Sequence, residues 1–122
     1  MDELCRNASI LRHIVQHCEK ISTLQERFGK DISVFLSDIA YYDSVFMNLL
    51  QIGELANRLP KKFQEAHSDI PWRQIIDLRN IIVHGYGTVK SSLLWKTICD
   101  DVPDLHSRVL GILSKQSEHG GV

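Results

Sequence analysis

Four side chains that can handle protons or phosphates lie within residues 79–86: Arg79, Asn80, His84 and Tyr86. Metal-free cleavage of RNA needs a base for the 2′-hydroxyl proton, an acid for the leaving 5′-oxygen and a cation for the phosphate. Histidine suits the first two roles because its pKa lies near neutrality. Arginine suits the third because its planar fork matches phosphate oxygens. Asn80 adds one more hydrogen bond to phosphate or ribose.

The pattern of the same stretch predicts the end of a helix. Leu78, Ile81 and Ile82 share one helical face, and two glycines follow as a stop signal. Positions five apart differ by roughly 140° on an ideal helix, so Arg79 and His84 do not point together. One copy of the motif also supplies one histidine for two proton-transfer roles. A two-fold dimer that joins two motifs in one cleft removes that shortage.

One spacing in this stretch resembles the R-x4-H-x-Y signature of the HEPN superfamily, specifically the HepT-like toxins. Four residues separate Arg79 from His84, and one residue separates His84 from Tyr86. The flanking sequence is similar to the same family over three further blocks, at residues 48–56, 70–73 and 94–95. The resemblance covers roughly residues 3 to 113, nearly the whole chain.

The resemblance implies an all-α, HEPN-type up-and-down helical bundle of about five helices, assembled as a two-fold homodimer. It also implies the toxin of a type VII toxin–antitoxin system, a metal-independent endoribonuclease that cleaves tRNA or mRNA. Arg79 and His84 would be catalytic at a composite site in the dimer interface, with Asn80 assisting or binding phosphate. No metal and no cofactor are expected.

Tyr86 is expected to have a different role. A phenol with a pKa near 10 is a poor base at neutral pH. The resemblance implies that Tyr86 is modified with AMP by a partner antitoxin, a minimal nucleotidyltransferase. AMP would add bulk and negative charge at the mouth of the cleft and repel RNA phosphate, as phosphorylation does.

Composition limits the possible sites. The chain has 122 residues, 43% of them hydrophobic, and a formal net charge of -1. That charge excludes a strongly basic nucleic-acid footprint over the whole chain, so any RNA site is local. Three widely spaced cysteines are typical of small core residues in a reducing compartment. No stretch is long enough for a membrane span, and we expect a cytoplasmic protein.

Apolar spacing, caps and breakers predict five helices: 2–28, 31–59, 60–67, 71–84 and 93–113. Gly29 would end the first and Asp31 would cap the second. Pro103 predicts a kink near residues 100–101. Residues 1–113 would form one domain and residues 114–122 a flexible C-terminal tail.

Structural alternatives exist for each candidate. Arg79 could pair with Glu54 or another carboxylate and simply join helices, and His84 could cap the last carbonyls of its helix. His13 and His17 have the spacing of two metal ligands, but no third ligand follows, which favours an ordinary helix face. The competing function is a non-catalytic HEPN scaffold or RNA-binding subunit that serves a nucleotidyltransferase.

Overall fold

The computed structural model describes residues 2–84 and 91–120, with side chains for 2–80 and 91–116. Most of the described backbone is helical, and no strand occurs in it. Its elements are α1 (Glu3–Phe28), α2 (Ile32–Ser37), α3 (Ile39–Arg58), α4 (Lys61–Ala66), α5 (Trp72–His84), α6 (Ser91–Lys96), the π-helical turn η1 (Thr97–Asp101) and α7 (Val102–Gly120).

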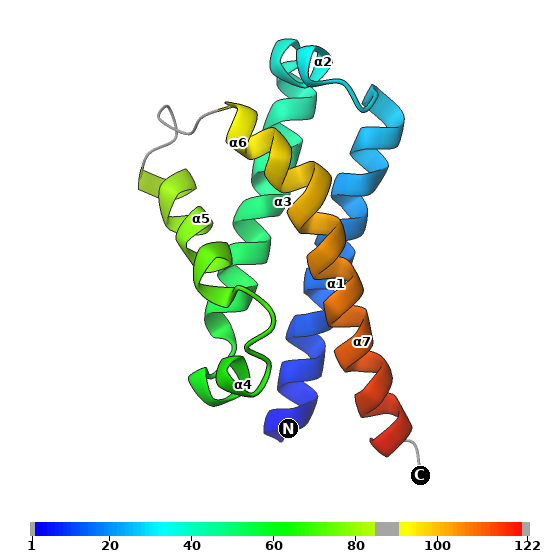
Figure 1. The fold of residues 1–122 in the computed structure, drawn as a ribbon, viewed down its shortest axis with the longest axis vertical. Helices are drawn as coiled ribbons and strands as arrows, with labels where there is room; N and C mark the ends of the chain where they lie inside the picture. Colours follow the sequence, from blue (N-terminus) through cyan, green and yellow to red (C-terminus); the bar gives the residue numbers. More distant parts are fainter. Residues whose placement is uncertain (1, 85–90, 121–122) are drawn as a thin grey trace.

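The four long helices, α1, α3, α5 and α7, run alternately up and down, so that α1 begins and α7 ends at the same end of the bundle (Figure 1). The central helix is α3, which packs against α1 on one side and α5 on the other, while α7 packs against α1. This position explains why the apolar stripe of α3 is wider than a surface helix needs. The predicted all-α, up-and-down bundle is confirmed, whereas its two-fold partner stays a prediction.

The first helix agrees with its predicted bounds. Leu11, Ile14 and Ile21 recur on one face and are fully buried. The Asp2 carboxylate caps the helix by accepting a hydrogen bond from the Cys5 amide. Gly29 ends it with a φ of 103°, a backbone conformation that favours glycine.

The single helix predicted for residues 31–59 is wrong, because it is interrupted at Asp38. This residue has extended backbone angles, and its carboxylate accepts hydrogen bonds from the amides of Ala40 and Tyr41. A short aspartate side chain competes with the helical hydrogen-bond pattern in this way and starts a new helix. The predicted cap at Asp31 is confirmed by its hydrogen bond from the Ser33 amide.

Two further boundaries differ from the prediction. Pro60 is the N-cap of α4 rather than its first helical residue. The predicted end near Leu113 lies inside α7, whose backbone stays helical to Gly120. At the place where a kink was predicted, the helix changes to the π-helical turn η1, which ends at Asp101, two residues before Pro103. Proline has no N–H to donate and clashes with the preceding turn, which a π-helical turn accommodates.

The cysteines only partly follow the prediction of core residues. Cys18 is buried, and burial raises the pKa of its thiol to about 12. Cys99 is half-buried, but Cys5 is exposed at the start of α1, so the core assignment is wrong for Cys5.

None of the helices in the described residues is long and apolar enough to cross a membrane.

Candidate functional site

The helix that carries the motif is fixed at its start by a tryptophan. Trp72 is 4% exposed, and its indole Nε1 donates a hydrogen bond to the carbonyl of His67 at 3.0 Å. The buried Ile70 lies just before the helix. These residues fix the start of α5 in the core, and the rest of the helix packs along α3, so the position of Arg79 two turns later is set by the core.

Gly53 allows α3 and α5 to approach closely at Arg79. A methyl group added at Gly53 would overlap the Arg79 Cβ and lie 3.2 Å from the carbonyl oxygen of Ile75. No residue with a side chain fits this crossing without displacing α5. The glycine therefore brings the Arg79 side chain directly against the α3 backbone, beside Glu54.

Arg79 is held by two hydrogen bonds. Its Nε donates to the Glu54 Oε1 at 2.7 Å, and its Nη1 donates to the Asn80 Oδ1 at 2.7 Å. The two charged side chains remain partly accessible, at 29% for Arg79 and 34% for Glu54. Both N–H groups on Nη2 have no partner within the described side chains. Nε and Nη1 are therefore engaged, and within the described side chains Nη2 is the nitrogen of the guanidinium that stays available to a ligand.

This arrangement changes the roles expected from the sequence. Asn80 uses its carbonyl oxygen to hold Arg79, so in this conformation it orients the guanidinium and only its amide NH₂ is left for phosphate or ribose. The sequence offers Glu54 as one possible carboxylate partner of Arg79, and the structure shows that the two form an ion pair. The sequence signal for this pairing is that the carboxylate of Glu54 lies on an apolar helix, directly after Gly53.

The structure describes less of the other two motif residues, His84 and Tyr86. His84 is the last residue of α5, and its side chain lies outside the description. The predictions for Tyr86 also fall outside the described residues. The backbone is helical as far as His84, so the last turn does not unwind to bring His84 toward Arg79. The ideal separation of roughly 140° between the two positions therefore holds within one copy.

The two histidines with metal-ligand spacing make separate contacts. The His17 Nδ1 lies 2.8 Å from the Asn48 Oδ1 on α3, whereas the His13 Nδ1 lies 2.7 Å from the carbonyl of Ser9. Within the described part of the chain, no group of three or more histidine, cysteine or carboxylate side chains is arranged to hold a metal ion.

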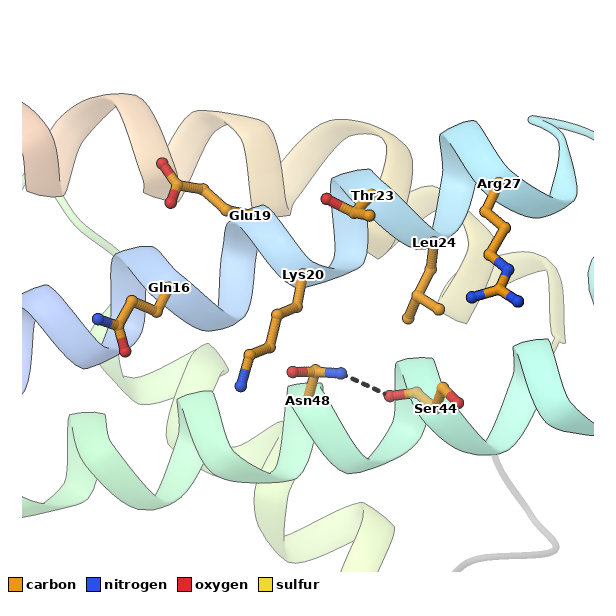
Figure 2. Close-up of a pocket in the computed structure, with 8 residues that line it drawn as sticks. All are labelled: Gln16, Glu19, Lys20, Thr23, Leu24, Arg27, Ser44 and Asn48. Atoms are coloured by element: carbon orange, nitrogen blue, oxygen red, sulfur yellow. Dashed lines mark hydrogen bonds between the residues drawn. The ribbon is translucent and has the colours of Figure 1, made fainter.

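Two grooves flank the central helix. One, of about 790 Å³, lies between α5 and the α6–η1–α7 segment, with a mostly apolar lining and the carboxylates of Asp77, Asp101 and Asp104. That chemistry does not suit a phosphate. The other, of about 560 Å³, lies between α1 and α3 and is lined by polar and cationic side chains, including Lys20 and Arg27 (Figure 2).

An all-α up-and-down bundle with an R-x4-H motif at the end of α5 defines a protein of the HEPN class. A family model described as Ribonuclease HepT-like matches residues 14–112, and the chain belongs to this family.

Two curated relatives agree with the family. One, "Putative RNase TTE0752" of Caldanaerobacter subterraneus subsp. tengcongensis, is 34% identical over 87% of this chain and 93% of its own length. The other, "Probable ribonuclease HepT" of Thermococcus cleftensis, is 34% identical over 70% of this chain and 79% of its own length. No solved structure matches significantly.

Proposed function

We propose that this chain is a metal-independent endoribonuclease that uses Arg79 and His84. The observation that carries the proposal is the Arg79 side chain, held by Glu54 and Asn80 while its Nη2 has no partner among the described side chains. An arginine oriented in advance binds phosphate with less loss of conformational freedom than a mobile one. Membership of a ribonuclease family supports RNA as the substrate.

In the proposed reaction, His84 of one copy removes the proton from the 2′-hydroxyl, and the 2′-oxygen attacks the adjacent phosphorus. The bond from phosphorus to the 5′-oxygen breaks, and His84 of the second copy protonates that oxygen. Arg79 stabilises the charge on the phosphate oxygens. The products are a 2′,3′-cyclic phosphate and a 5′-hydroxyl, and mapping the ends of the fragments tests the scheme. Fragments with a 5′-phosphate would contradict it.

The composite site makes a quantitative prediction for mixed dimers. If both histidines share one cleft, a dimer of wild type and His84→Ala lacks either the acid or the base. Activity of an equal, fully exchanged mixture then falls to about a quarter, because only wild-type homodimers cut. Independent sites would leave about half of the activity. Wild type mixed with Gly111→Ala, which keeps the motif, should retain full activity and controls for losses caused by the mixing procedure.

We further propose that Tyr86 is the regulatory residue. The chain would act as the toxin of a type VII toxin–antitoxin pair, and a nucleotidyltransferase would transfer AMP from ATP to the phenol oxygen and release pyrophosphate. Labelling with radioactive ATP is expected for the wild-type protein and not for Tyr86→Phe. Equal labelling of both proteins would place the modification elsewhere.

A non-catalytic scaffold is the second candidate, because an Arg79–Glu54 ion pair is also a contact that a purely structural arginine makes. Arg79→Lys separates the two. It keeps the positive charge beside Glu54 but loses the planar fork. A catalytic role predicts a stable protein with greatly reduced RNA cleavage. A scaffold predicts no cleavage by wild type and unchanged binding of the nucleotidyltransferase by the variant.

A further inference from the structure

The first helix carries a row of basic side chains, three of them arginine or lysine, that the motif does not use. Arg6, His13, Lys20 and Arg27 follow one another at intervals of seven residues, and all four are exposed. An ideal helix turns by only about 20° from perfect alignment over seven residues, so these side chains share one face. In a chain with a net charge of -1, this row concentrates positive charge locally.

The last two cations of the row border the groove between α1 and α3. Figure 2 shows the Lys20 and Arg27 side chains extending from α1 toward α3, where Ser44 and Asn48 form the opposite wall. Arg27 lies over the Phe28 ring, with its Cζ 5.7 Å from the ring centroid, which limits its mobility. The Asn48 side chain is already hydrogen-bonded to Ser44 and His17.

Lys20 and Arg27 are the two cations that line the groove. Among the residues with described side chains, neither cation takes part in an ion pair. Glu19 also lines the groove, and its Oε2 lies 3.1 Å from the Nε2 of His106 on α7. Two turns of helix separate the two cations by about 10 Å along the axis. A nucleic-acid strand, with one phosphate per nucleotide, supplies a phosphate to each of them.

The groove and Arg79 border the same exposed face of α3. Asn48, Gln51 and Glu54 are three residues apart, so each step turns about 60° around the helix. Asn48 lines the groove, Gln51 is exposed, and Glu54 holds Arg79. A strand bound at Arg79 can therefore cross this face of α3 and reach the groove.

We infer that the α1–α3 groove is a second RNA-binding site, in which Lys20 and Arg27 hold backbone phosphates of a strand whose scissile bond lies at Arg79. This inference rests on the proposed ribonuclease function. On this inference, the substrate binds at two places: the cleavage site at Arg79, and a distant contact in the groove that does not depend on the RNA sequence. Substrates long enough to reach the groove gain affinity from it, and very short ones do not.

The test measures RNA binding in a His84→Ala background, which prevents cleavage. The probe is a fluorescent single-stranded RNA of about 15 nucleotides, titrated at several KCl concentrations. Lys20→Ala/Arg27→Ala is expected to weaken binding and to reduce the slope of log affinity against log salt by about 1.4, or 0.7 for each lost phosphate contact. The matched control, Lys61→Ala/Lys62→Ala, removes the same charge from exposed lysines on α4 and should keep the slope.

Three results would overturn the inference. Equal salt slopes for the groove variant and the α4 control would show that Lys20 and Arg27 bind RNA no more specifically than other surface cations. In that case, cleavage of RNA by wild type would still support the proposed function. Loss of binding to the nucleotidyltransferase, with RNA binding unchanged, would make the groove a protein-binding surface. Failure of the wild-type protein to cleave any RNA, together with no RNA binding in the His84→Ala background, would remove both proposals.

Discussion

Replacing Gly53 by alanine tests whether the close crossing of α3 and α5 positions Arg79. Alanine favours a helix over glycine by about 1 kcal/mol. Against this, the new methyl group overlaps the Arg79 Cβ and crowds the Ile75 carbonyl. Neither atom can move by a side-chain rotation, so the helices must separate, and overpacking of this kind costs about 1–3 kcal/mol. Because the overlap is severe, we expect a net destabilisation of about 1–2 kcal/mol.

Thermal and urea unfolding followed by circular dichroism measure this change. The matched control is Gly111→Ala on α7, where an added methyl group meets nothing within 4 Å. That variant should gain about 0.5–1 kcal/mol, because only the helix propensity changes. Gly53→Ala should also cleave RNA more slowly at a temperature where it remains folded, because Arg79 is displaced from Glu54. A Gly53→Ala protein as stable and active as Gly111→Ala would refute the reasoning.

Three further predictions concern single side chains. Asp38→Ala should destabilise the protein by about 1 kcal/mol in urea unfolding by removing the cap of α3, whereas Asp38→Asn should retain most of the stability. Glu54→Ala should slow RNA cleavage about fivefold, equivalent to about 1 kcal/mol for one lost contact to Arg79, and Glu54→Gln should lose less. Cys18 should resist alkylation at pH 8 until the protein unfolds, while Cys5 reacts. Because burial raises the pKa of Cys18 above its unfolded value, its contribution to stability is present below pH 9 and is lost as pH rises toward 12.

Most of the fold could be predicted from local signals in the sequence. The spacing of Leu11, Ile14 and Ile21 and the stop at Gly29 define α1, and both are seen in the structure. The interruption at Asp38 was missed because the apolar pattern continues on both sides of it. Only the hydrogen bonds to the following amides show that the aspartate caps a new helix.

The site was less predictable, because it depends on two helices far apart in sequence. The spacing of Arg79 and His84 indicated the chemistry, but not which side chains hold the arginine. The role of Gly53 follows from the distance between α3 and α5, which no local pattern contains. The pairing of Arg79 with Glu54 rather than with another carboxylate likewise required the packed bundle.

RNA cleavage by purified protein in excess EDTA tests the central claim most directly. Wild type, His84→Ala and Arg79→Ala would be compared on the same RNA, with sizing to verify that all three have the same oligomeric state. We predict that wild type cleaves without metal, that both variants lose cleavage, and that all three are dimers. Equal cleavage by wild type and His84→Ala, or cleavage by wild type that disappears in EDTA, would contradict the account.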